Sequence, residues 1–379
     1  MLLLNLHVLG RDDHQWIETR GNSIHAIGAS ENFVAGDDSF KFEFENAIAF
    51  PGLVNSHDHL EFNLFPKLGN GKYNDYVEWG EDIHKTNGET IEKITNIPLR
   101  TRMRYGIYKN VLNGITTVVH HGNFAVDDNY PIDVHSNYNY LHSVRLERYW
   151  KLKLNLAPNR LPFLIHIGEG TNQESYQEID ELIRLNLFKR RIIGIHGIMM
   201  DERQAEHFEA VVWCPASNYF LYGSTSHILK IKRSTSILFG TDSNVSADWN
   251  LWDHLRLARS NSQLDDRELF DALTSTAAKV WNLDGNGSLS PGCKADIVIA
   301  ERKSPDFFNS FYALNPNNIL MVIKNGKIIL FDPTLLTQMQ SSGGDLSQFN
   351  KLVFDGSIKF VRGLPVELIP GLEPFLRNG

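Results

Sequence analysis

The sequence predicts an α/β protein in which β-rich segments at both ends of the chain flank a central region of alternating strands and helices. Apolar stretches of strand length, such as 163–167 and 192–195, alternate with amphipathic helical patterns, such as 176–187 and 251–258. Strands that are apolar on both faces are typical of parallel sheets covered by helices. Near the C-terminus, Asn325-Gly326 is the two-residue signal of a β-hairpin.

The order of these elements predicts two structural parts. Residues 1–50 have the pattern of short strands joined by turns, and Pro51-Gly52 ends that pattern. Strands and helices then alternate as far as Trp281, after which the strand pattern returns. We expect the two β-rich segments to complete one sheet. This gives a composite domain of residues 1–50 and 284–379 beside a domain of residues 51–283.

The composition is that of a globular protein without a nucleic-acid or membrane partner. The 379 residues are 42% hydrophobic and 22% charged, and the net charge of −8 gives no basic surplus for nucleic acid or anionic lipid. No apolar stretch approaches the roughly 20 residues of a membrane span, and the first residues lack a secretory signal. Two cysteines, Cys214 and Cys293, are too few for a disulfide framework. We therefore expect a cytoplasmic protein with a small-molecule substrate and no nucleic-acid or membrane partner, and a homo-oligomer is left open.

A histidine pair follows the first strand of the central region. The chain has 15 histidines, and His57 and His59 come directly after the short strand 53–55. Residues two apart on a strand point the same way, so both imidazoles can bind one metal ion. The alternative is that they are two polar residues that cap a strand.

Three further polar residues end later apolar strands. They are His166, His196 and Asp242. In a barrel of parallel strands, active-site residues gather at the carboxyl ends of several strands. Each residue alone is readily explained as a satisfied structural group, but the repetition at the same end favours a site. Glu169, three residues after His166, is placed to serve as a proton shuttle; the alternative is an exposed loop acid.

Six segments together resemble a known family. The chain resembles the amidohydrolase superfamily, in particular its branch of cytosine, guanine and adenosine-type deaminases and triazine hydrolases (chlorohydrolases). The matching segments occur in the family's order and spacing, and they are residues 51–60, 114–118, 166–169, 214–218, 240–243 and 287–296.

The resemblance implies a TIM-like (β/α)8 barrel with a composite β-sandwich domain. It implies that His57, His59, His166 and Asp242 bind one divalent metal, with zinc as the first expectation and iron as the alternative. Glu169 is then the proton shuttle, His196 orients water or polarises the substrate, and Asp242 also takes a proton from the attacking water. Three imidazoles and one carboxylate suit zinc or ferrous iron and leave a position for water. Cys214 is not included among the ligands.

The implied activity is that of a metal-dependent hydrolase acting on a carbon–nitrogen bond, an aminohydrolase (deaminase) of a nitrogen heterocycle. An amidase, a cyclic-amide hydrolase or a halide hydrolase with the same site is the first alternative. A non-catalytic barrel that binds a ligand is the second.

The chain departs from the pattern between the second and fifth strands. From Val119 to His166 is 47 residues, where three strand–helix units take about 90. The barrel is therefore expected to be abbreviated around strands 3 and 4, between Asn123 and Leu164. Within this stretch we expect one strand at 138–144 and the remnant of another at 152–156.

Several other residues near the motifs carry weaker expectations. A carboxylated lysine at the fourth strand, which a binuclear site needs, is not expected, because Lys151 and Lys153 do not clearly end a strand. The pair His120-His121 follows the second strand, and His121 is expected to contact substrate; the alternative is an exposed loop pair. The aromatic residues Tyr73, Tyr76 and Trp79 form either a lid or, as we favour, packing on the barrel.

Overall fold

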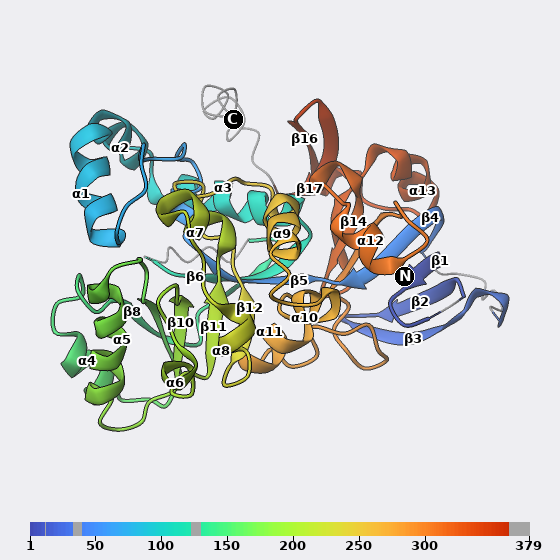
Figure 1. The fold of residues 1–379 in the computed structure, drawn as a ribbon. Coiled ribbons are helices and arrows are strands. Elements are labelled where there is room, and N and C mark those ends of the chain that lie inside the picture. The colour runs from blue at the N-terminus through green and yellow to red at the C-terminus, as the bar shows by residue number, and fades with distance from the viewer. Residues whose placement is uncertain (12, 33–39, 123–129, 364–379) are drawn as a thin grey trace.

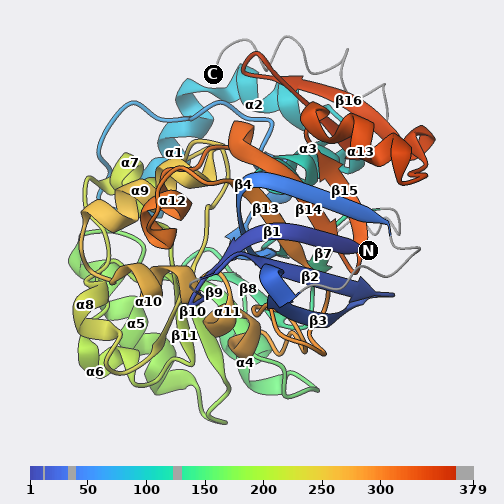
Figure 2. The same cartoon turned by 90° about the vertical axis from the view of Figure 1, so that its right-hand side faces the viewer.

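Strands from both ends of the chain form a single nine-stranded sheet. The computed structural model describes residues 1–11, 13–32, 40–122 and 130–363. In Figures 1 and 2 the first strands and the last strands lie side by side. The order across the sheet is β16 (Phe349–Phe354), β17 (Ser357–Arg362), β15 (Lys327–Phe331), β14 (Ile319–Lys324), β13 (Ile297–Glu301), β4 (Lys41–Pro51), β1 (Leu2–Val8), β2 (Gln15–Arg20) and β3 (Ser23–Ala29).

The two ends of the chain meet at β4 and β13. These strands are antiparallel, with Val298 opposite Phe50, and β4 pairs in parallel with β1 on its other side. The prediction that residues 1–50 share a sheet with the C-terminal strands is therefore confirmed. The proposed domain boundaries stay a prediction, and residues 364–379 lie outside the described part of the chain.

The predicted hairpin at Asn325-Gly326 joins β14 to β15. Both turn residues have positive φ, 49° and 73°, as a two-residue turn between twisted strands requires. A side chain at Gly326 would place its Cβ 1.9 Å from the carbonyl oxygen of Gly21. Only glycine fits this close approach between the hairpin and the turn after β2.

Eight short strands of the central region follow one another in chain order. Parallel ladders join them into a three-stranded sheet, β5-β6-β7, and a five-stranded sheet, β8-β9-β10-β11-β12. Backbone N–H groups of Thr241 and Asp242, just after β12, donate to the carbonyl of His57 in β5, so the last strand returns to the first. The bounds are β5 Leu53–Asp58, β6 Ile115–His120, β7 Asp133–His135, β8 Asn139–Ser143, β9 Phe163–Ile167, β10 Ile192–His196, β11 Ala210–Trp213 and β12 Ser236–Phe239.

The third and fourth strand–helix units are short, as the chain length predicted. Only residues 136–138 separate β7 from β8, so no helix lies between them. The strand expected at 138–144 is β8. The strand remnant expected at 152–156 is wrong, because this segment belongs to helix α4 (Trp150–Leu156). Asn123, the predicted start of the abbreviated stretch, lies outside the described residues.

Helices cover the outside of the strands, as the amphipathic patterns predicted. The side chain of Asn172 caps the first turn of α5, and Ile179 and Leu182 lie on its buried face. The pattern over 269–280 belongs to two helices with a break at Thr274, α10 and α11, rather than one. Besides α4, the helices of the described residues are α1 Tyr76–Thr86, α2 Gly88–Thr95, α3 Leu99–Leu112, α5 Gln173–Leu185, α6 Glu202–Ala205, α7 Pro215–Tyr222, α8 Ile228–Ile231, α9 Leu251–Ser260, α10 Asp266–Asp271, α11 Ser275–Val280, α12 Phe307–Tyr312 and α13 Leu336–Ser341.

A small apolar core fills the space that the strands enclose. It includes Val54, Leu164 and Val212, and the indole of Trp281 packs with them. Residues on the opposite face of the same strands, such as Phe163 and Ile165, join the larger core beneath the helices. Because side chains two apart on a strand share a face, His166 continues the inner row that Leu164 begins.

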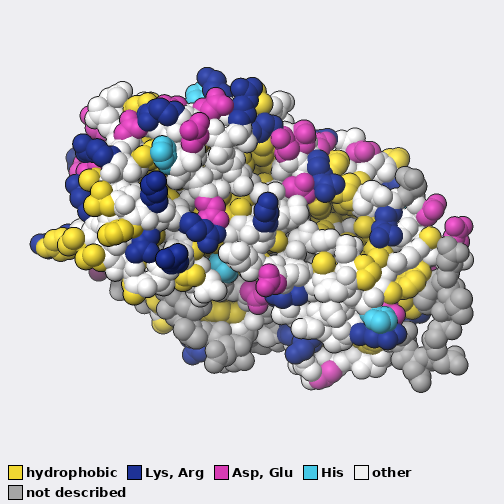
Figure 3. Space-filling view, turned by 90° about the horizontal axis from the view of Figure 1, so that it is seen from below, with side chains coloured by type: hydrophobic (Ala, Val, Ile, Leu, Met, Phe, Trp, Pro, Cys, Tyr) yellow, Lys and Arg dark blue, Asp and Glu magenta, His cyan; other side chains and the backbone are white. Residues whose placement is uncertain are grey.

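The outer surface near α4 is unusually apolar. Leu152, Leu156, Leu187 and Phe188 are each more than half exposed. In Figure 3 hydrophobic side chains lie among Lys and Arg side chains at this end of the molecule, on the left. No helix that the structure describes is long and apolar enough to span a membrane.

Candidate metal centre

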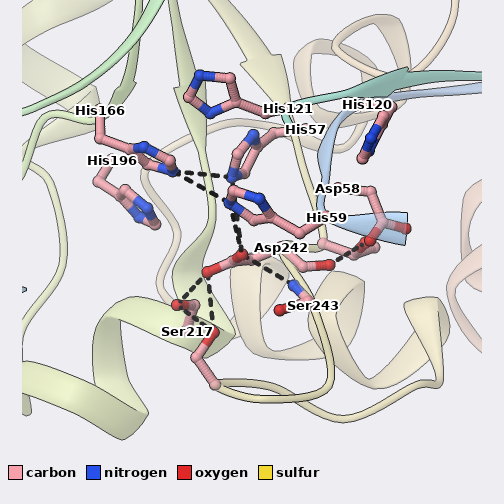
Figure 4. Close-up of polar contacts among 12 residues, drawn as sticks. His57, Asp58, His59, His120, His121, His166, His196, Ser217, Asp242 and Ser243 are labelled. Atoms are coloured by element: carbon pink, nitrogen blue, oxygen red, sulfur yellow. Dashed lines mark hydrogen bonds and ion pairs between the residues drawn. The ribbon is translucent and has the colours of Figure 1, made fainter. Parts of the chain in front are cut away.

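The four predicted metal ligands converge from three separate strand ends. His57 lies in β5 and His59 directly follows it, His166 lies in β9, and Asp242 follows β12. All four are close together in Figure 4. His57 is fully buried, and His166 and Asp242 are 5% and 6% exposed. The parallel arrangement of the strands brings their carboxyl ends to one place, which is why residues far apart in sequence meet here.

The spacing of the imidazole nitrogens fits a shared metal ion. His166 Nε2 lies 3.3 Å from His57 Nε2 and 3.3 Å from His59 Nε2. Two nitrogens bound tetrahedrally to one zinc lie about 3.3–3.4 Å apart, given bond lengths near 2.0–2.1 Å. His166 Nδ1 donates to the carbonyl of His142 at 3.0 Å, so the lone pair of a neutral His166 is on Nε2, as in many metal sites. Facing lone pairs repel unless a cation lies between them, and the donor set therefore suits a divalent metal.

Asp242 is held against these imidazoles by hydrogen bonds. Its Oδ1 lies 3.6 Å from His57 Nε2 and 3.8 Å from His59 Nε2, and accepts from the backbone N–H of Ser243. The hydroxyls of Ser217 and Ser246 donate to Oδ2 at 2.7 and 2.8 Å. Asp242 has a φ of 56°, a costly conformation for a non-glycine residue that is typical of functional sites.

Electrostatics favour neutral imidazoles and an ionised carboxylate. Burial lowers the pKa values of His57, His59 and His166, and the neighbouring imidazoles add to the effect for His59 and His166. Burial alone would raise the pKa of Asp242, but its hydrogen bond with His57 holds it well below its usual value. Neutral imidazoles and carboxylates are the forms that bind a metal.

Glu169 and His196 lie together at one side of the imidazoles. Glu169 is 6% exposed, and its Oε1 lies 3.6 Å from His196 Nε2. Burial raises the pKa of Glu169, so the prediction of a buried shuttle is favoured over an exposed loop acid. The amide oxygen of Asn218 lies 2.8 Å from His196 Nδ1, which must donate to it. Nε2 of a neutral His196 therefore faces Glu169 as an acceptor.

Two hydrogen-bond contacts that the sequence analysis missed fix the position of Glu169. Tyr222, at the end of α7, donates from its hydroxyl to Glu169 Oε1 at 2.8 Å. The hydroxyl of Tyr76 donates to Glu178, which in turn accepts the backbone N–H of Gly168 just before Glu169. A tyrosine eight residues after Cys214 carries no sequence signal of this contact, because only the fold brings α7 beside β9.

A buried polar network lies beneath the metal ligands and was also missed. Lys109, in α3, is 4% exposed, and its Nζ donates to Asn63 Oδ1 at 2.7 Å and to the carbonyl of Asp242 at 3.2 Å. It pairs with Asp58 at 3.5 Å, and Asp58 stands between His57 and His59. The sequence carries no clear signal of this network, because Lys109 lies beside Asn110 in a helix that also holds several arginines.

The remaining candidates differ in how the structure places them. His120 and His121 are both buried, so the alternative of an exposed loop pair is wrong. Lys151 and Lys153 lie on α4 and pair with glutamates rather than with the site, in agreement with the expectation of no carboxylated lysine. Burial raises the pKa of the Cys214 thiol well above its usual value, which disfavours it as a ligand.

Of the aromatic residues after the first motif, Tyr73 and Trp79 pack, as we favoured, while the hydroxyl of the buried Tyr76 bonds to Glu178. Tyr73 joins Ile198, Leu221 and Tyr222 in a small apolar cluster, with Trp79 against its edge. This cluster lies beside the Glu169 end of the site, since Tyr222 contacts Glu169 directly.

Comparisons with known proteins agree with this geometry. Residues 162–329 match the model of the amidohydrolase family. The 5-methylthioadenosine/S-adenosylhomocysteine deaminase of Caldicellulosiruptor saccharolyticus is 26% identical over 202 residues, which is 46% of this chain and 47% of the relative. The chain thus spans about half the length of the first curated relatives it matches. A match to the deaminase of that name from Carboxydothermus hydrogenoformans, 21% identical, covers 87% of this chain and 92% of the relative.

Solved structures of the same fold extend over most of the chain. An adenosine deaminase from Xanthomonas campestris with bound zinc has a TM-score of 0.67 at 17% identity, and covers 90% of this chain and 96% of its own. An atrazine chlorohydrolase from Arthrobacter aurescens TC1 complexed with zinc has a TM-score of 0.66 at 16% identity, and the match covers 90% of this chain and 98% of the chlorohydrolase chain. At this identity the likeness shows the fold, and the predicted α/β class is confirmed. The segment that matches the amidohydrolase family model, residues 162–329, contains His166, Glu169, His196 and Asp242.

Proposed function

We propose that the protein is a metal-dependent hydrolase that deaminates a nitrogen heterocycle, with zinc as its ion. The observation that carries the proposal is the meeting of three imidazole Nε2 atoms and the Asp242 carboxylate, with the buried Glu169 beside them. His57, His59, His166 and Asp242 are the proposed ligands. When bound, the ion supplies Lewis-acid chemistry that makes water a nucleophile near neutral pH.

The side chains around the ligands have proposed parts in the proton transfers. Replacing an amino group on a ring carbon adds the oxygen of water, breaks the carbon–nitrogen bond and releases ammonia. Glu169 takes a proton from water and delivers it to the ring nitrogen beside the attacked carbon, because its raised pKa lets it both accept and donate. Asp242 assists the second transfer, onto the departing amine. His196, fixed by Asn218, orients water or the substrate.

The substrate class we propose is an amino-substituted heterocycle of the adenine type. Support comes from the relatives, which are named for deamination of 5-methylthioadenosine and S-adenosylhomocysteine, and from the fold likeness to an aminofutalosine deaminase from Helicobacter pylori. Halide displacement is the second candidate, favoured by the likeness to an atrazine chlorohydrolase. A non-catalytic barrel is disfavoured, because every predicted ligand position carries a donor atom that lies within 3.8 Å of a donor atom of another predicted ligand. A cytoplasmic setting and a composite β domain stay part of the proposal.

Ammonia and halide release from a panel of purine nucleosides, pyrimidines, aminotriazines and chlorotriazines by the zinc-loaded protein tests this function. Glu169→Gln keeps the size of the side chain but removes its exchangeable proton. We expect this variant to retain metal and substrate binding and to lose about 10²–10⁴-fold in turnover. Turnover at the wild-type rate would show that Glu169 is not the shuttle, and release of halide but not ammonia would favour the second candidate.

A further inference from the structure

A fourth imidazole, from His121, lies against the three proposed ligands. His121 follows β6 directly and is fully buried. One ring nitrogen from each of four histidines lies within 4.8 Å of the other three; the histidines are His57, His59, His121 and His166. None of the roles argued above requires this side chain to be so close to the metal position.

The hydrogen bonding of His121 leaves one nitrogen free for a ligand. Nε2 lies 3.1 Å from the backbone carbonyl of Leu141, in β8. A carbonyl only accepts, so Nε2 carries the proton and donates it. Nδ1 is then a bare lone pair in the neutral ring, and it is buried with no hydrogen-bond partner among the residues that the structure describes. A backbone carbonyl that fixes the tautomer while the other nitrogen faces an ion is the usual second shell of a metal-bound histidine.

The four rings surround a common point. The centroid of His121 lies 5.4 Å from that of His57, 5.5 Å from that of His59 and 4.4 Å from that of His166. The three proposed ligands are separated from one another by 4.8–5.3 Å. His121 therefore adds a fourth ring to the three proposed imidazole ligands, and Figure 4 shows it above His57. Since nitrogens on one ion lie about 3.3 Å apart, a shift on the order of 1 Å brings Nδ1 into bonding distance.

We propose that His121 binds the metal ion directly through Nδ1, as a fourth imidazole beside His57, His59 and His166. The inference rests on the proposed function only in that it requires a metal at this centre. It assigns to His121 a role in metal binding in place of the substrate contact expected from its loop position.

X-ray absorption spectroscopy of the zinc-loaded wild-type protein counts the imidazoles on the ion without any substitution. Four imidazoles support the proposal, and three overturn it. A wild-type protein that binds no zinc would instead remove the proposed function, so the two failures are distinguishable.

A pair of variants provides the second test. His121→Gln is compared with His254→Gln, because His254 is also buried, also bonds a carbonyl through Nε2 and also leaves Nδ1 without a partner, but lies outside the group of facing imidazoles. We expect His121→Gln to raise the zinc dissociation constant at least tenfold, as loss of even an outer-shell partner does, and to change the visible spectrum of the cobalt-loaded protein. His254→Gln should change neither. An unchanged cobalt spectrum in His121→Gln, with or without a loss of affinity, would place His121 outside the coordination sphere and overturn the proposal.

Discussion

The hydroxyl of Tyr222 should set the pH at which the proposed shuttle works. Tyr222→Phe removes a hydrogen bond of 2.8 Å to Glu169 and leaves the ring in its apolar cluster. A hydrogen bond donated to an ionised group contributes about 1.5–3 kcal/mol, and one pKa unit corresponds to about 1.36 kcal/mol. This bond favours the ionised carboxylate and so lowers the pKa of Glu169. Its loss should therefore raise that pKa by about 1–2 units.

The consequence appears on the acid side of the pH profile. Glu169 accepts a proton only when ionised, so kcat/KM falls as the pH drops through its pKa in the free enzyme. In Tyr222→Phe this acid limb should move to higher pH, while activity on the alkaline plateau and zinc content stay close to wild type. Profiles of kcat/KM against pH for both proteins measure the shift. An acid limb that does not move, in a variant with full metal content, would refute the view that Glu169 is the titrating base.

Two predictions concern stability. Lys109→Met leaves the buried Asp58 carboxylate without its cation, and breaking such a pair costs about 3–5 kcal/mol. Urea unfolding should show most of that loss of stability, and adding Asp58→Asn should recover part of it. No loss of stability in the single variant would contradict the buried network. Gly326→Ala forces a Cβ against the carbonyl of Gly21 at a positive φ, so its free energy of unfolding, measured by urea denaturation, should fall by more than the roughly 1 kcal/mol typical of such a change in an open turn. An unchanged free energy of unfolding would show that the hairpin can shift away.

That the proposed ligands lie close together could be predicted from the sequence, because their positions follow from a general property of parallel strands. Their role as metal ligands was implied by the family resemblance and stays a prediction. His166 ends an apolar strand, and His57 and His59 follow one, so the carboxyl-end rule placed them together without knowledge of the loops. The contacts of Tyr222 and Lys109 could not be predicted in this way. Both depend on contacts between residues that are 46 to 133 positions apart in the chain.

The error at α4 has a physical cause. Leu152, Leu154 and Leu156 alternate with polar residues, which indicates a strand. In the structure Trp150 and Leu154, four apart, are the buried residues, while Leu152 and Leu156 are 57% and 70% exposed. The helical face is only two residues wide, and the exposed leucines gave the segment a false period of two.

The central claim is that one divalent ion sits among residues from three strand ends. Anomalous diffraction at the zinc edge, from crystals of the metal-loaded protein, tests it most directly. The account predicts one strong peak within about 2.0–2.3 Å of Nε2 of His57, His59 and His166 and of an Asp242 carboxylate oxygen. No peak at this position, or an ion bound elsewhere with these four side chains bonded only to one another, would contradict it.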